Sequence, residues 1–152
     1  MKARAAVILI QNDKIALIER HRLGRHYFVF PGGKIEAGES PAFTAERESK
    51  EELGLDLKIG PMVAEVWFHG SPQYYYLADR LDGQFGHGTG TEMSSLMDSK
   101  KGTYLPVWIR VDELLSQPVL PKLMAEYVWK SHHTNWPESP LVVTENQPDE
   151  LV

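Results

Sequence analysis

The sequence predicts an α+β or α/β sandwich, in which helices pack on a mixed β-sheet, and three observations favour this fold class. Short runs rich in β-forming residues alternate with turn signals along most of the chain. One helix with clear start and stop signals interrupts these runs, and a second helical segment follows near the C-terminus. The 152 residues fit a single domain that can bury a core without disulfides.

The first third of the chain predicts a hairpin, a short strand and a helix. Gln-Asn-Asp separates the first two β-rich runs, which suits an antiparallel hairpin. A Pro-Gly-Gly turn ends the next run. Ser40 is suited to cap a helix that begins at Pro41 and ends before Gly54. The predicted elements are strands at Ala5–Ile10, Lys14–Glu19 and Tyr27–Phe30 and a helix at Pro41–Leu53.

The remainder predicts further strands at Leu55–Ile59, Val63–His69, Tyr74–Ala78 and Val107–Val111, with helical segments at Asp112–Leu115 and Pro121–Lys130. The glycine-rich stretch Gly83–Gly102 is long for a loop, and such loops are usually functional or disordered. We expect a domain over residues 1–131. We expect residues 132–152, which contain three prolines and four acids but no lysine or arginine, to form a loosely attached acidic tail.

Composition excludes several classes of protein. The chain has no cysteine, so disulfide frameworks, thiolate nucleophiles and sulfur-ligated metals are ruled out. A net charge of −5 argues against stable nucleic-acid binding through a broad basic face. The N-terminal apolar run Ala5–Ile10 is too short for a signal peptide or a membrane helix, so we expect a cytoplasmic protein without membrane attachment.

The helix Pro41–Leu53 concentrates negative charge on one side. At about 100° per residue, the carboxylates of Glu48, Glu51 and Glu52 share an arc of about 100°. The adjacent stripe (Ala42, Ala45, Ser49 and Leu53) should face the core, whereas Glu46 and Lys50 should face water. Carboxylates four residues apart repel one another, and a hard divalent cation such as Mg²⁺ relieves this repulsion. The alternative is a solvated acidic face.

Residues 33–55 resemble the signature of the Nudix hydrolases: glycine, five residues, glutamate, seven residues, Arg-Glu, an aliphatic residue, any residue, Glu-Glu, any residue, glycine and an aliphatic residue. Ser49 departs from the pattern, standing where the family has an aliphatic residue. Because Ser49 lies on the core stripe, its hydroxyl is expected to bond to the Ala45 carbonyl, with consequences for packing rather than chemistry. The matching residues are Gly33, Glu39, Arg47, Glu48, Glu51, Glu52, Gly54 and Leu55.

The resemblance implies a Nudix-type α/β/α sandwich with a mixed sheet and assigns roles to these residues. Glu51 and Glu52 would ligate Mg²⁺, which Mn²⁺ can replace, together with the carbonyl of Gly32. Glu48 would ligate metal or act as general base. The catalytic candidates are therefore Glu48, Glu51 and Arg47, with Arg47 orienting a carboxylate. Gly33, Glu39 and Gly54 would shape the loop and the helix.

Two further groups lie outside the signature. Basic residues gather between the second strand and the Pro-Gly-Gly turn, and we expect Arg22 or Arg25 to contact substrate phosphates rather than to form an ordinary solvated turn. Glu92 in the glycine-rich stretch resembles, loosely, the position from which some Nudix enzymes draw an additional metal ligand.

The resemblance implies hydrolysis of a nucleoside diphosphate linked to another moiety, by attack of water at phosphorus. The substrate would be a small nucleotide: a nucleoside triphosphate, ordinary or oxidised, or a nucleoside diphosphate derivative. The alternative is a non-catalytic nucleotide-binding sensor with the same fold, which predicts broken metal ligands. A third interpretation, an acidic helix used as a protein-binding surface, predicts no dependence on divalent ions. Small proteins of this type often form homodimers, and the tail is a candidate for exchange between subunits.

Overall fold

The computed structural model describes residues 2–86 and 102–145. Its elements, in chain order, are β1 (Arg4–Gln11), β2 (Lys14–Arg22), β3 (Arg25–Val29), β4 (Gly32–Lys34), α1 (Pro41–Leu53), β5 (Leu55–Phe68), β6 (Ser71–Gly83), β7 (Thr103–Arg110), the 3-10 turn η1 (Val111–Glu113), β8 (Val119–Leu120), α3 (Lys122–His133) and β9 (Leu141–Glu145).

The strands form a mixed sheet in the order β8-β3-β2-β1-β6-β5-β9, with β4 paired to β1 and β7 paired to β2. The pairs β1–β6, β3–β8 and β5–β9 are parallel, and the others are antiparallel. The predicted hairpin joins β1 to β2 through Asn12 and Asp13, whose φ angles of 52° and 61° are those of a tight hairpin turn. The mixed-sheet prediction is confirmed.

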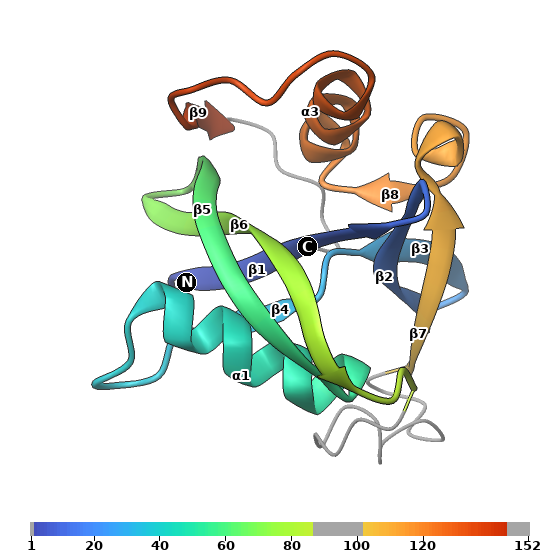
Figure 1. The fold of residues 1–152 in the computed structure, drawn as a ribbon, viewed down its shortest axis with the longest axis horizontal. Helices are drawn as coiled ribbons and strands as arrows, with labels where there is room; N and C mark the ends of the chain where they lie inside the picture. The colour runs from blue at the N-terminus through green and yellow to red at the C-terminus, as the bar shows by residue number, and fades with distance from the viewer. Residues whose placement is uncertain (1, 87–101, 146–152) are drawn as a thin grey trace.

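Hydrophobic cores fill both faces of the sheet, because alternate residues of a strand point to opposite faces. On β2, Ile15 and Leu17 join the core beneath α3, whereas Ala16 and Ile18 join the core beneath α1. Figure 1 shows α1 and α3 on opposite sides of the curved sheet. The arrangement is the expected α/β/α sandwich. One side of α1 packs on the sheet, and its other side faces away from this core.

Helix α1 begins and ends where its capping signals predict. The Ser40 hydroxyl accepts a hydrogen bond from Phe43 N at 3.2 Å, and Gly54 ends the helix at a φ of 78°. Glu46 and Lys50 are exposed, as the wheel predicts, and Ala42 is half-buried. Ser49 is fully buried and its hydroxyl donates to the Ala45 carbonyl at 2.6 Å, which confirms the expected bond.

Several strands differ from the sequence-based expectation. The two runs predicted around residues 55–69 form one strand, β5, because Gly60-Pro61 shifts the register between Ile59 and Met62 without ending the pairing with β6. The short strands β4 and β8 were not predicted. The segment expected at Asp112–Leu115 is only the 3-10 turn η1, Val111–Glu113.

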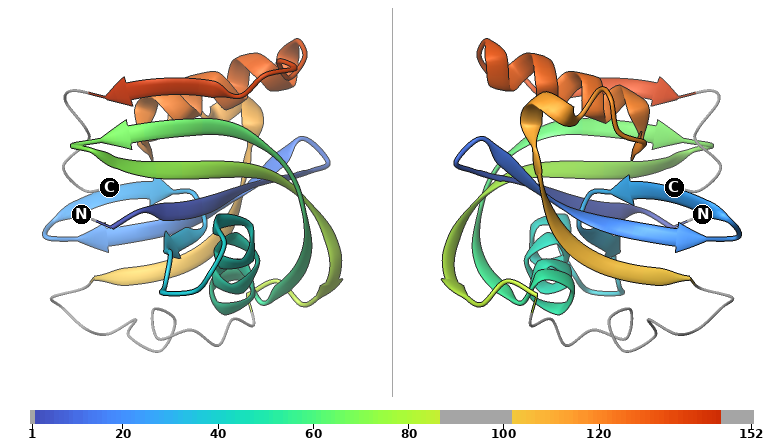
Figure 2. Two further views of the ribbon diagram at one scale, coloured as in Figure 1. Left: turned by 90° about the vertical axis from the view of Figure 1, so that its left-hand side faces the viewer. Right: turned by 90° about the vertical axis from the view of Figure 1, so that its right-hand side faces the viewer.

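Residues 132–145 are more ordered than a loosely attached tail. Helix α3 continues to His133, and β9 pairs in parallel with β5 from Leu141 to Glu145 at the edge of the sheet (Figure 2). Proline and acidic composition suggested a tail, but Leu141, Val142 and Val143 belong to a strand that pairs with the distant strand β5. The domain boundary at residue 131 stays a prediction. None of the helices in the described residues is long and apolar enough to cross a membrane.

Candidate active site

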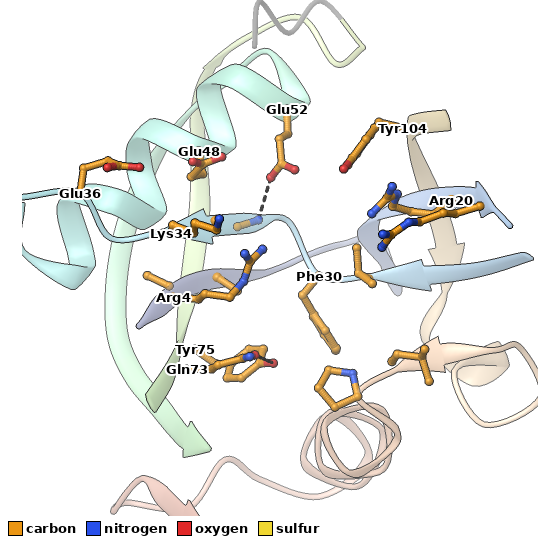
Figure 3. Close-up of a pocket in the computed structure, with 18 residues that line it drawn as sticks. Arg4, Arg20, Phe30, Lys34, Glu36, Glu48, Glu52, Gln73, Tyr75 and Tyr104 are labelled. Carbon is orange, nitrogen blue, oxygen red and sulfur yellow. Dashed lines mark hydrogen bonds between the residues drawn. The ribbon is translucent and has the colours of Figure 1, made fainter. Parts of the chain in front are cut away.

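A pocket of about 460 Å³ lies where α1 meets the ends of β1, β2, β4 and β7. Carboxylates of α1 form one side, cationic side chains from the strands form another, and aromatic rings lie between and beyond them (Figure 3). The side chains that carry the argument below are Arg4, Arg20, Arg22, Lys34, Glu48, Glu52 and Tyr104.

The acidic side of the pocket comes from Glu48 and Glu52, which lie one helical turn apart. Their residues are only 6% and 5% exposed. Glu52 Oε1 accepts a hydrogen bond from the backbone N–H of Gly32 at 2.7 Å, which ties the helix to β4. A Cβ atom on Gly33 would overlap the Glu48 carboxylate. A side chain at position 33 would therefore displace the Glu48 carboxylate, which packs directly on the backbone of β4.

Arg47 connects the carboxylates around this edge. Its Nε and Nη2 donate to both oxygens of Glu39 at 2.6 and 3.0 Å, which makes a bidentate pair. Its Nη1 donates to Glu48 Oε1 at 2.9 Å and also reaches Glu51 Oε2 at 3.3 Å. Arg47 does not line the pocket, and its guanidinium instead contacts Glu39, Glu48 and Glu51.

Glu39 holds the loop that precedes α1. Besides Arg47, its carboxylate accepts bonds from the Thr44 hydroxyl at 2.8 Å and the Glu36 backbone N–H at 2.9 Å. The bonds from Arg47 first, and from the Glu36 N–H second, lower the pKa of Glu39 from 4.5 to about 2. The same pair raises the pKa of the Arg47 guanidinium above its ordinary value. Glu39 is therefore charged at all ordinary pH values and shapes the loop.

The donor set of this edge fits a hard divalent cation. Glu48 and Glu52 bring carboxylates into the pocket, Gly32 of β4 lines it with its backbone carbonyl as its one ligand atom, and Glu51 flanks it with its side chain 33% exposed. These donors are all oxygens, the ligands that Mg²⁺ and Mn²⁺ prefer. Two buried carboxylates one helical turn apart repel each other, and a bound cation would offset this unfavourable free energy.

Four cationic side chains also line the pocket, and two of them, Arg4 and Lys34, lie outside the basic stretch that the sequence singled out. Arg4, Arg20, Arg22 and Lys34 line it, coming from β1, β2 and β4. The Arg20 guanidinium lies 3.7 Å from the centre of the Tyr104 ring on β7, where the two residues are cross-strand partners. Within the described residues, Arg22 Nε is buried without a hydrogen-bond partner.

The structure separates the two arginines that the sequence offered for phosphate contact. Arg22 lines the pocket, but Arg25 is exposed and does not line it. Arg20, the lower-ranked candidate of the same basic stretch, also lines the pocket, because strand alternation places it on the same face as Arg22. Arg4 and Tyr104 depend on pairings that join distant segments. Gly54 ends α1 as expected. Glu92 lies outside the described residues.

The fold and this acidic helix edge define a protein of the Nudix type, and comparison with known proteins identifies the family. The NUDIX domain model matches residues 1–128. The chain belongs to the Nudix family.

Curated relatives match parts of the chain. A CMP-5'-(N-acetyl-N-hydroxy-3-aminopropyl)phosphonate hydrolase from Streptomyces rubellomurinus is 36% identical over 89 residues, 51% of this chain and 42% of that protein. The 8-oxo-dGTP diphosphatase of Escherichia coli is 30% identical over 88 residues, covering 55% of this chain and 57% of that protein. The matches thus span about half the length of these two relatives.

Solved structures share the fold at low identity. A NUDIX hydrolase from Nitrosomonas europaea superposes with a TM-score of 0.70 at 18% identity, covering 96% of this chain and 79% of that one. An ADP-ribose pyrophosphatase from Streptococcus suis gives a TM-score of 0.65 at 20% identity, covering 95% of this chain and 98% of that one. These likenesses support the fold that the sequence predicted.

Proposed function

We propose that the protein is a divalent-cation-dependent pyrophosphohydrolase that cleaves a nucleoside diphosphate linked to another moiety. The observation that carries the proposal is the division of one pocket into two charged sides. The carboxylates of Glu48 and Glu52 occupy one side, and the arginines of β1 and β2 occupy the other. A diphosphate bridges such a pocket, because metal neutralises it from one side and guanidinium groups bind it from the other.

Glu48, Glu51, Glu52 and the Gly32 carbonyl would hold Mg²⁺, and Mn²⁺ would substitute for it. Bound there, the cation supplies charge neutralisation of the diphosphate and lowers the pKa of the attacking water. Family membership implies this metal dependence, and the oxygen-only donor set supports it.

The side chains of the pocket divide the remaining work. Arg20 and Arg22 bind phosphate oxygens and hold the phosphorus in line with the attacking water. A glutamate at the acidic edge takes the proton from that water. Glu48 and Glu51 are the candidates, and Glu48 has the better position because it lines the pocket whereas Glu51 flanks it. Arg47 and Glu39 hold the helix edge in register and do not touch substrate.

We infer that the other part of the substrate is a nucleoside or nucleotide. The names of three similar proteins specify a CMP phosphonate, 8-oxo-dGTP and ADP-ribose, all nucleotide derivatives. In this chain the Tyr104 ring, backed by Arg20, offers a flat surface beside the cationic side of the pocket. A nucleobase stacks favourably on such a surface.

The experiment is a comparison of Glu52→Gln with Glu46→Gln on a panel of nucleoside triphosphates and nucleoside diphosphate derivatives. Phosphate and pyrophosphate release is followed with Mg²⁺, with Mn²⁺ and with EDTA. Glu52→Gln keeps an oxygen that can accept the Gly32 N–H but removes the charge. We expect turnover to fall at least about a hundredfold with little change in melting temperature.

Glu46→Gln is the matched control, because Glu46 is on the same helix but exposed to solvent away from the pocket. We expect it to retain normal turnover. Hydrolysis that persists in EDTA, or a Glu52→Gln enzyme with the wild-type rate, would exclude the proposed metal edge. Nucleotide binding without turnover in any metal would instead support the sensor interpretation.

A further inference from the structure

A second group of metal-ligating side chains lies on the hairpin of β2 and β3, away from the pocket. Glu19, His21 and His26 each offer one ligand atom, and these three atoms lie within 4.8 Å of one another. His21 and His26 are direct cross-strand partners. Because alternate residues face opposite sides of a strand, these side chains point away from the pocket face that carries Arg20 and Arg22.

The three side chains are already in contact with one another. His26 Nε2 lies 2.7 Å from Glu19 Oε2. The two imidazole rings stack with centroids 4.4 Å apart and planes 10° from parallel. The His26 ring also packs against the buried Phe28 ring, with centroids 5.0 Å apart and planes 64° apart.

Solvent can reach the group. The side chains of His26 and Glu19 are 42% and 23% exposed. Donors bound to one Zn²⁺ at about 2.0–2.1 Å lie roughly 3.3 Å apart. Binding of one ion therefore requires the side chains to rotate until the two rings leave their parallel stack and the three donor atoms converge. Thr103 Oγ1, 3.4 Å from His21 Nδ1, marks the side of the cluster next to β7.

We propose that Glu19, His21 and His26 form a Zn²⁺ site on the outer face of the β2–β3 hairpin. Two imidazoles and one carboxylate are a donor set that suits Zn²⁺ and disfavours Mg²⁺, which prefers oxygen ligands alone. Water would complete the coordination. The ion would tie β3 to β2 directly behind the strand positions that carry Arg20 and Arg22 to the pocket, so the site is a brace for that hairpin.

The test is calorimetric titration of the full chain with Zn²⁺ in excess Mg²⁺, which keeps the oxygen donors of α1 occupied. We expect one Zn²⁺ per wild-type chain. His26→Ala and Glu19→Gln should each weaken binding at least about tenfold. The control is His69→Asn, because His69 is exposed in the β5–β6 turn at a φ of 47°, which asparagine tolerates.

A second measurement avoids variants altogether. Imidazole nitrogen resonances of the wild-type protein are recorded during the same titration. The proposal expects the His21 and His26 resonances to move and those of His69 to stay. Equal Zn²⁺ affinity in the His26→Ala protein, absence of binding to the wild type, or shifts at His132 and His133 in place of the hairpin histidines would each overturn the proposal.

Discussion

Replacing Arg47 with methionine should destabilise the protein far more than its partly exposed position suggests. Arg47 is 25% exposed, yet its guanidinium donates to Glu39, Glu48 and Glu51. A charge-assisted hydrogen bond contributes about 1.5–3 kcal/mol, and losing one partner of a buried pair costs about 3–5 kcal/mol. Partial exposure of Arg47 and the longer contacts to Glu51, at 3.3 and 3.4 Å, reduce the expected destabilisation. We therefore expect a loss of about 2–4 kcal/mol in the free energy of unfolding.

The assay is urea denaturation near neutral pH in EDTA, with Lys50→Met as the matched control. Lys50 lies on the same helix, and its one ion pair, with Asp56 at 3.3 Å, joins side chains that are half exposed. Such surface pairs contribute about 0–1 kcal/mol. Added Mg²⁺ should recover part of the stability of Arg47→Met, because a cation then relieves the carboxylate repulsion. Equal losses in the two variants would refute the role given to Arg47.

Two further predictions concern the same loop and helix. Gly33→Ala should lower turnover at least about tenfold while the chain stays folded, because the new Cβ displaces the Glu48 carboxylate. The check is a comparison of steady-state rates with those of Gly38→Asn, in which the new side chain points into open space. Equal rates in the two variants would contradict the prediction. The pKa of Glu39 is about 2 in the folded protein and 4.5 ordinarily, so its contribution to stability is complete above pH 4.5 and is lost as pH falls toward 2. Urea midpoints should therefore fall more steeply on acidification in the wild type than in Glu39→Gln, and parallel curves would contradict the assignment.

Local signals account for the parts of the fold that the sequence predicted correctly. The Ser40 cap, the following proline and Gly54 define α1 without reference to any distant residue. The tight turn at Asn12 and Asp13 defines the first hairpin in the same way. The acidic edge of α1 follows from helical periodicity, so its composition was also predictable.

The rest depends on contacts between distant segments. Tyr104 reaches the pocket only because β7 pairs with β2 across more than 80 residues, as the Arg20–Tyr104 register shows. The sequence on both sides of strand β9 is rich in proline and acidic residues, which is typical of a tail. Only the pairing of β9 with β5 makes it part of the sheet. Arg25 is a neighbour of Arg22 in the chain and its cross-strand partner, but only Arg22 lines the pocket.

The central claim is that the carboxylates of α1 hold a divalent cation at the edge of the pocket. A crystal soaked in Mn²⁺ and measured at a wavelength where manganese scatters anomalously locates that ion directly. The account predicts an anomalous peak at coordination distance, about 2.0–2.6 Å, from carboxylate oxygens of Glu48, Glu51 and Glu52. A fully soaked crystal with no peak there, or with these glutamates turned away from one another, would contradict it.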